Sequence, residues 1–384
     1  MKNVSIKDAF SVICSLIWSN LILIVVFAVS LGCGGVTGKA HAPNTAQTYL
    51  EQGNASYERG LFDDALAEYT KALGADSGAA EIYYNRGLTY HAKGLYDEAI
   101  SDYTKALERN STYSLAYNNR GLAYVAKGLT DMAIADYSKA IELDPSGGVF
   151  FFNRGLVYAQ KGLVDQAITD FTKAIELGGE TARPYFHRAN AFFLKGNYDK
   201  AISDYSTALG IDRRYASAYG NRGLAYSVRG EYDLAISDYD AALQISPGFT
   251  AAYCNRGMVY AAKGLYDKAI ADYTKAIEVQ PRYALAYFNR AVAYTAKGQH
   301  DPAIADYTKA VEINSKYAEA YTNRGVLYYG KNQPERAIAD YTKAIQIDPR
   351  YAEAYVNRGN AYYATGQYQE AFSDYNKALE IRPR

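Results

Sequence analysis

The chain has 384 residues, with 41 basic and 41 acidic side chains and a formal net charge of zero at neutral pH. This balance gives no electrostatic basis for binding nucleic acid, which requires a basic surface. Cys14, Cys33 and Cys254 form neither a disulfide framework nor a zinc-binding spacing.

The first element in the chain is a targeting segment, residues 1–33. Lys2 and Lys7 precede an apolar run from Ala9 to Leu31, which is long enough for a membrane-spanning helix of about 20 residues. The order of charge and apolar run favours a cytoplasmic N-terminus. We therefore expect the rest of the chain to face the periplasm or the exterior of a bacterial cell.

Three interpretations of this segment remain open. Residues 30–34, Ser-Leu-Gly-Cys-Gly, resemble a bacterial lipobox, which makes Cys33 the candidate for lipidation, although Ser30 stands where leucine is usual. An uncleaved membrane anchor is the second interpretation, and a cleaved secretory signal ending near Ala42 is the third. Residues 34–45 are expected to be a flexible tether.

From residue 46 onward the sequence repeats with a period of 34 residues, which is typical of a solenoid. The triplet Asn-Arg-Gly begins at residues 85, 119, 153, 221, 255, 323 and 357, with altered copies in register at residues 187 and 289. We divide the array into repeats 1 to 10: 46–79, 80–113, 114–147, 148–181, 182–215, 216–249, 250–283, 284–317, 318–351 and 352–384.

Each repeat is expected to form two antiparallel helices. In repeat 2, apolar residues follow helical spacing from Glu81 to Lys93, and Gly94 ends the pattern. A second helical run begins at Asp97, whose carboxylate suits the first turn of a helix.

A set of six residues in repeat 2 resembles the tetratricopeptide repeat pattern: Tyr83, Gly87, Tyr90, Ala99, Tyr103 and Ala106. The resemblance covers residues 46–384. It implies an all-α fold, a right-handed α-solenoid superhelix of ten helix-turn-helix repeats, here preceded by an N-terminal hydrophobic helix.

One departure from the family pattern is systematic. Arg replaces the usual Leu before the Gly in nine repeats, from Arg86 to Arg358, and Asp stands sixteen residues later in the same nine, from Asp102 to Asp374. Repeat 1 lacks both. This paired absence predicts Arg–Asp contacts within or between repeats; a row of arginines reaching a ligand is the alternative.

The resemblance implies that first helices line a concave groove, which positions 2, 5, 6, 9, 12 and 13 of each repeat face; we call these the groove positions. Eight repeats have Asn at position 6: Asn85, Asn119, Asn153, Asn221, Asn255, Asn289, Asn323 and Asn357. An amide can both donate to and accept from a peptide backbone, so this asparagine row is a candidate peptide-binding site. The alternatives are hydrogen bonds to a neighbouring helix, or inheritance by duplication.

Apolar side chains at other groove positions vary between repeats, as expected of a specific binding surface. The candidates are Tyr84, Leu122, Phe152, Phe186, Phe193, Met258, Phe288 and Tyr329. Repeat 5 is irregular, with His187 in the asparagine row and Arg183 nearby in sequence. On the final helix, apolar residues such as Phe372 and Leu379 make the C-terminal end a candidate for self-association.

Catalytic patterns are absent from the sequence. No two of the four histidines share a repeat, and neither a phosphate-binding glycine loop nor a metal-binding histidine pair occurs. We therefore expect no enzyme activity, metal or cofactor. The predicted function is a scaffold that binds proteins or extended peptides at a bacterial envelope. The alternatives are an assembly factor for exopolysaccharide export or for pilus or outer-membrane biogenesis, and a glycan-binding repeat protein.

Overall fold

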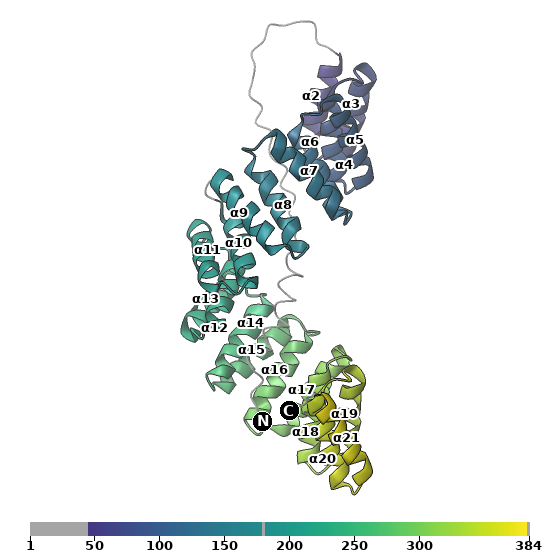
Figure 1. Cartoon of the computed structure of the whole chain (residues 1–384). Coiled ribbons are helices and arrows are strands. Elements are labelled where there is room, and N and C mark those ends of the chain that lie inside the picture. The colour runs from purple at the N-terminus through teal and green to yellow at the C-terminus, as the bar shows by residue number, and fades with distance from the viewer. Residues whose placement is uncertain (1–44, 179–180, 382–384) are drawn as a thin grey trace. The chain divides into compact units, whose positions relative to one another are not determined.

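The computed structural model describes residues 45–178 and 181–381. The predicted targeting segment with Cys33, and nearly all of the tether, lie outside these residues. Within them, the regular structure consists of twenty α-helices arranged as paired helix-turn-helix repeats of a solenoid (Figure 1). The all-α solenoid prediction is confirmed. None of the helices in the described ranges has the length and apolar character needed to cross a bilayer.

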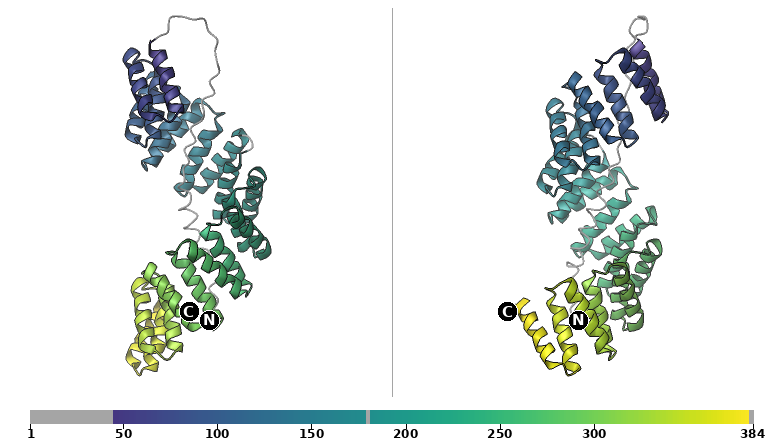
Figure 2. Two further views of the ribbon diagram at one scale, coloured as in Figure 1. Left: turned by 180° about the vertical axis from the view of Figure 1, so that it is seen from behind. Right: turned by 90° about the vertical axis from the view of Figure 1, so that its right-hand side faces the viewer.

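The described residues divide into two compact halves at the boundary between Arg213 and Arg214, and paired helices stack along each half (Figure 2). The described helices of the first half are α2 (Thr45–Glu58), α3 (Phe62–Ala75), α4 (Ala80–Ala92), α5 (Tyr96–Arg109), α6 (Ser114–Ala126), α7 (Thr130–Leu143), α8 (Gly148–Gln160), α9 (Val164–Gly178), α10 (Ala182–Leu194) and α11 (Tyr198–Ile211).

The helices of the second half continue the same alternation. They are α12 (Ala216–Val228), α13 (Tyr232–Ile245), α14 (Thr250–Ala262), α15 (Tyr266–Val279), α16 (Ala284–Ala296), α17 (His300–Ile313), α18 (Ala318–Gly330), α19 (Pro334–Ile347), α20 (Ala352–Ala364) and α21 (Tyr368–Ile381). Even-numbered labels are the first helices of repeats and odd-numbered labels are the second helices.

The turn between the two helices of a repeat depends on a left-handed backbone conformation. Gly94 has a φ of 74°, and the amide of Leu95 donates to the carbonyl oxygen of Tyr90 over 2.9 Å. This is the Schellman arrangement, which satisfies a carbonyl at the end of a helix. In repeat 9 Asn332 takes the glycine's place with a φ of 57°, as asparagine tolerates this region better than other residues with a side chain.

Close packing within a repeat depends on small residues facing a buried aromatic ring. A Cβ atom on Gly87 would lie 2.8 Å from the ring of Tyr103, which is fully buried. Ala99, also fully buried, lies on the same second helix as Tyr103. The two helices therefore approach closely because Gly87 has no side chain, as the sequence pattern predicts.

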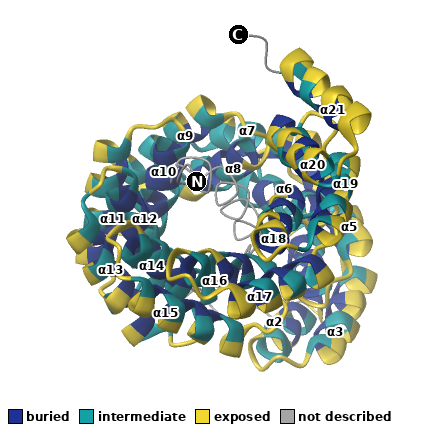
Figure 3. Cartoon of the chain, turned by 90° about the horizontal axis from the view of Figure 1, so that it is seen from below, coloured by how far each residue is buried: buried dark blue, intermediate teal, exposed yellow. Residues whose placement is uncertain are grey.

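First helices lie on the inner side of each half and second helices on the outer side (Figure 3). In the first half α8 and α10 are inner while α7 and α9 are outer, and in the second half α14 and α16 are inner while α15 and α17 are outer. The first helices therefore line the inner side of each half, as the family resemblance implies.

Candidate functional site

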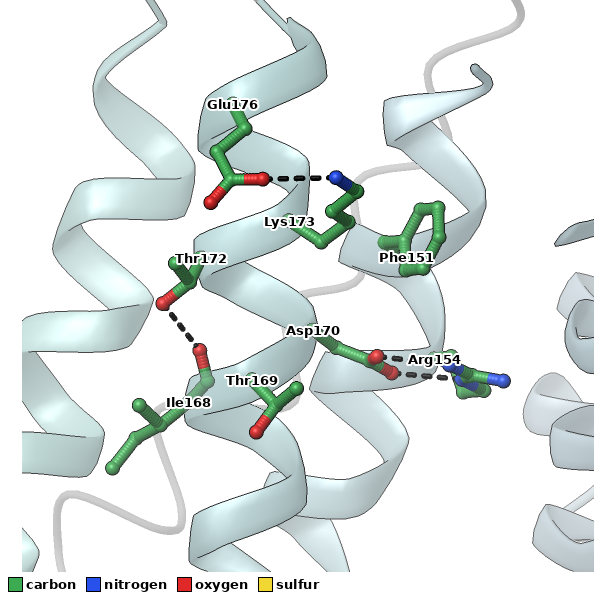
Figure 4. Close-up of a pocket in the computed structure, with 8 residues that line it drawn as sticks. All are labelled: Phe151, Arg154, Ile168, Thr169, Asp170, Thr172, Lys173 and Glu176. Atoms are coloured by element: carbon green, nitrogen blue, oxygen red, sulfur yellow. Dashed lines mark hydrogen bonds and ion pairs between the residues drawn. The ribbon is translucent and has the colours of Figure 1, made fainter. Parts of the chain in front are cut away.

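Every arginine of the repeated triplet forms an ion pair with the aspartate sixteen residues later. Arg154 donates from Nε and Nη2 to the two carboxylate oxygens of Asp170, over 2.8 and 2.9 Å (Figure 4). The other eight pairs have the same geometry: Arg86–Asp102, Arg120–Asp136, Arg188–Asp204, Arg222–Asp238, Arg256–Asp272, Arg290–Asp306, Arg324–Asp340 and Arg358–Asp374. The Arg–Asp prediction is confirmed, and each pair lies within one repeat.

The same arginines also connect neighbouring repeats. Arg154 donates from Nη1 to the hydroxyl of Ser138, on the second helix of the preceding repeat, over 2.9 Å. Its guanidinium carbon lies 5.8 Å from the ring centre of Phe151 and 5.6 Å from that of Tyr158. The hydrogen bond to Asp170 raises the pKa of Arg154, and burial opposes the rise. The N–H donors of this guanidinium have partners within the array, and aromatic rings lie near it. Arg154 therefore stabilises the repeats rather than binding a ligand.

A second series of ion pairs was not predicted from the sequence. In seven repeats a lysine stands directly before the left-handed turn residue and contacts an aspartate thirty residues earlier, on the second helix of the preceding repeat; for Lys161 and Asp131 the distance is 2.5 Å. The other pairs are Lys93–Asp63, Lys127–Asp97, Lys195–Asp165, Lys263–Asp233, Lys297–Asp267 and Lys331–Asp301. These ion pairs could have been predicted from the sequence, because aspartate and lysine recur at a constant spacing of thirty residues.

The asparagine row lies where consecutive first helices meet. Asn85 is buried, and its amide donates to Asn54 of the preceding repeat over 3.1 Å. Asn119 donates to the hydroxyl of Tyr84 over 2.7 Å, and Asn153 to Asn118 over 2.9 Å. In each of these three residues the amide nitrogen therefore forms a hydrogen bond to a neighbouring helix, as the alternative interpretation of the row expects.

The remaining five asparagines of the row, Asn221, Asn255, Asn289, Asn323 and Asn357, are half-buried. Asn323 shares a hydrogen bond with the hydroxyl of Tyr307. The amide nitrogen of Asn289 is buried and has no hydrogen-bond partner. Leaving a buried donor unpaired costs about 1–3 kcal/mol, so Asn289 is the member of the row that would gain from an external acceptor.

The predicted apolar groove residues differ widely in exposure. Five are buried in the array: Tyr84, Phe152, Phe186, Phe193 and Phe288. Leu122 and Met258 are half-buried. Tyr329 is 41% exposed, and it is the one of the eight whose side chain is open to solvent.

Most of the exposed apolar side chains at groove positions lie in repeats 8 to 10, and in repeat 10 these are Val356, 40% exposed, and Tyr363, 56% exposed. Val292 is 36% exposed and Val326 is 37% exposed, each at position 9 of its repeat, and Tyr329 lies one turn beyond Val326 on α18. We call Val292, Val326 and Tyr329 the apolar strip. Glu319 and Glu353 are exposed at position 2 of repeats 9 and 10.

Glu319 and Glu353 both influence the ionisation of Tyr351. Burial is the main cause of the raised pKa of Tyr351, and the negative charges of Glu353 and Glu319 raise it further. No Lys or Arg occupies a groove position in repeats 8 to 10. This part of the groove is therefore apolar and bears negative charge.

Repeat 5 places a histidine in the asparagine row among aromatic rings. The ring centre of His187 lies 5.5 Å from that of Phe152, 5.8 Å from Phe171 and 5.2 Å from Phe186. Its Nδ1 is buried without a hydrogen-bond partner. Burial, with a contribution from Arg183, lowers the pKa of His187 to about 3, so the ring is neutral at physiological pH.

Nothing in the described ranges provides reaction chemistry of a recognisable kind. No three His, Cys, Asp or Glu side chains of these residues are placed to hold a metal ion. Cys254 is buried, and burial raises the pKa of its thiol.

Comparisons with protein families agree with the repeat geometry. A tetratricopeptide repeat model matches residues 80–113, 114–146, 216–249, 250–283 and 352–384, and a TPR repeat model matches 53–94, 189–227, 293–332 and 327–366. Two further tetratricopeptide repeat models match 272–305 and 150–177. The chain belongs to the tetratricopeptide repeat family, whose members are typically non-enzymatic scaffolds that bind peptides and partner proteins.

Solved structures resemble this chain in fold. A tetratricopeptide repeat protein from Parabacteroides merdae is 22% identical, with a TM-score of 0.51 over 67% of this chain and 98% of its own. YrrB, described as a TPR protein with an unusual peptide-binding site, is 28% identical, with a TM-score of 0.43 over 48% of this chain and 95% of its own. MamA is 30% identical, with a TM-score of 0.40 over 41% of this chain and 93% of its own. No curated protein sequence is significantly similar to this chain.

Proposed function

We propose that this chain is a non-enzymatic scaffold at a bacterial envelope that binds an extended peptide or a partner protein in the groove of its first helices. The observation that carries the groove proposal is the apolar strip of Val292, Val326 and Tyr329. These side chains are exposed at positions that face a ligand in the family, whereas Tyr84, Phe152, Phe186, Phe193 and Phe288 at other groove positions are buried. Burying them against a partner would be favourable by about 25 cal/mol per Å².

The surroundings of the strip define the chemistry of the partner. Glu319 and Glu353 are exposed at groove positions of repeats 9 and 10, and no Lys or Arg occupies a groove position in repeats 8 to 10. A segment with aliphatic or aromatic residues next to Lys or Arg would satisfy both features. The amide nitrogen of Asn289, which lacks a partner, could donate to a carbonyl oxygen of such a segment once its side chain rotates toward the ligand.

Selection from a library of short random peptides on the full chain tests this proposal. Peptides that combine apolar residues with Lys or Arg should be enriched. The double variant Val292→Asn, Val326→Asn should bind them at least about tenfold more weakly. Asn occurs at this repeat position in Asn54, Asn190 and Asn360, so the variant should keep its fold.

Val279→Asn is the matched control, because Val279 is 43% exposed at the end of a second helix, α15, rather than in the groove. Its peptide binding should equal that of the unmodified chain. Enrichment of no peptide, or equal binding by the double variant, would argue against the groove. Retention of polysaccharide after protease treatment would favour the glycan-binding alternative instead.

The envelope location rests on the apolar run Ala9 to Leu31 and on Cys33. Expression of the full chain in a Gram-negative bacterium, followed by cell fractionation and mass spectrometry of its N-terminus, tests it. An acylated Cys33, lost in Cys33→Ser, would identify a lipoprotein; an intact N-terminus in the membrane fraction would identify an anchor. Recovery in the cytosol would contradict both.

A further inference from the structure

Repeats 1 to 4 carry an exposed leucine at the same place, directly after the turn glycine. Leu61 is 49% exposed, Leu95 38%, Leu129 41% and Leu163 40%. We call these four residues the leucine row. They lie at the turns between first and second helices, away from the groove positions described above.

The turn itself does not require leucine. The backbone amide at this position donates to the carbonyl oxygen five residues earlier in the leucine repeats, as in Leu95 to Tyr90 over 2.9 Å. Asn197, Glu231 and Gln299 make the same bond in repeats 5, 6 and 8, over 2.9 Å in each case. Since polar residues make the same hydrogen bond, the bond does not explain why leucine recurs in four consecutive repeats, and contact with a partner is one role of apolar side chains exposed in a row.

Acidic side chains project beside the leucine row. The stretches 58–64, 92–98, 126–132 and 160–166 together contain seven acidic and four basic side chains. The side chains of Asp63, Asp97 and Asp131 are 87%, 78% and 85% exposed. The lysines paired with them, Lys93, Lys127 and Lys161, are only 27%, 34% and 31% exposed.

This arrangement disfavours an anionic membrane surface, because carboxylates are the outermost charges. We propose that the leucine row is a second interaction surface, and that its partner is an apolar segment rich in Lys or Arg, such as a basic amphipathic helix. Leucines would contact the apolar face of that segment, and exposed carboxylates would attract its cations. This surface is separate from the groove and does not depend on the function proposed for it.

A fluorescent peptide of about 18 residues that forms an amphipathic helix of leucine and lysine is the probe. The full chain should bind it, and the same peptide with glutamate in place of lysine should bind much more weakly. The double variant Leu95→Gln, Leu129→Gln should weaken binding at least about tenfold. Gln occupies the equivalent place in repeats 8, 9 and 10, so the variant should keep its fold and its circular dichroism spectrum.

Two controls locate the binding. Leu265→Gln changes an equally exposed leucine, 40%, that stands alone in repeat 7, and should leave affinity unchanged. The groove variant Val292→Asn, Val326→Asn should also bind the probe normally. Equal affinity of the leucine-row variant, or absence of binding by the unmodified chain, would overturn the proposal. A loss of binding to anionic vesicles in that variant would identify a lipid surface instead, and a change in sedimentation would identify a second copy of the chain.

Discussion

The three residues of the Asn-Arg-Gly triplet have different surroundings, although they are consecutive on one helix. In repeat 4, Gly155 packs against the ring of Phe171, where an added Cβ would lie 2.8 Å away. Arg154 pairs with Asp170 in its own repeat and with Ser138 in the preceding one. Asn153 donates across the junction to Asn118. All three side-chain positions therefore contribute to the framework, and a binding role for the asparagine adds to a structural one.

Arg154→Leu should lower the free energy of unfolding by about 3 kcal/mol, because it leaves the buried carboxylate of Asp170 without its partner. Urea denaturation followed by circular dichroism measures this loss. Lys161→Leu is the matched control; it breaks the pair with Asp131, whose side chain is 85% exposed, and exposed pairs contribute less than about 1 kcal/mol. An Arg154→Leu chain with unchanged stability but weakened peptide binding would instead place this arginine in a ligand site.

His187 should make stability depend on pH. Its pKa is lowered from 6.5 to about 3 in the folded chain, so the unfolded chain binds more protons between these values. Stability is therefore complete above pH 6.5 and falls as the pH decreases, by about 2 kcal/mol at pH 5. In His187→Asn this part of the pH dependence should disappear from urea titrations at pH 8 and pH 5.

Any pH dependence of stability that remains in His187→Asn has a second source, because burial also lowers the pKa of His91. His300→Asn, which changes an exposed histidine, is the control. If His187→Asn and the unmodified chain lost the same stability between the two pH values, the environment assigned to His187 would be wrong.

At the scale of elements, local signals in the sequence were sufficient to predict where the helices begin and end. Gly94 and Asp97 mark the end of one helix and the start of the next, and α4 and α5 follow this division. The Arg–Asp pairs could also be predicted, because both residues are missing together from repeat 1. These features depend on contacts within one repeat.

Exposure of the groove could not be predicted in the same way. Phe193 and Tyr329 both stand at position 12 of their repeats, but the first is 6% exposed and the second 41%. The difference depends on which side chains the neighbouring repeats place against them, and periodicity alone does not contain that information. The leucine row was missed because a leucine after a turn glycine is ordinarily explained by helix termination.

The glycine at position 8 of the repeat controls how closely the two helices pack. A Cβ on Gly121 would lie 2.7 Å from the ring of Tyr137, so Gly121→Val should lower the free energy of unfolding by about 2 kcal/mol through overpacking. Gly74→Val should change it by less than about 0.5 kcal/mol, because nothing lies within 4 Å of the Cβ that it adds on α3. Thermal and urea denaturation of the two variants would test this, and equal effects would contradict the close approach.

At the scale of the whole molecule, the repeats form a framework of nearest-neighbour contacts. Arg324 of repeat 9 donates to Thr308, and Lys331 pairs with Asp301, both in repeat 8. Repeat 7 carries the same residue types, Thr274 and Asp267, at the equivalent positions. In a solenoid, stability is approximately the sum of repeat and junction contributions, so one repeat of the array can replace another at such a junction.

Deletion of residues 284–317, which removes α16 and α17 together, should therefore keep the fold. Arg324 would then meet Thr274, and Lys331 would meet Asp267, which rebuilds both contacts in register. Helicity per residue, measured by circular dichroism, should equal that of the full chain, with a cooperative melt. Deletion of residues 284–299 removes α16 but leaves α17 without its partner helix, so this chain should lose helicity beyond the residues removed and should aggregate. If both deletions lost helicity to the same extent, stabilisation would extend beyond adjacent repeats, and the nearest-neighbour description of this array would fail.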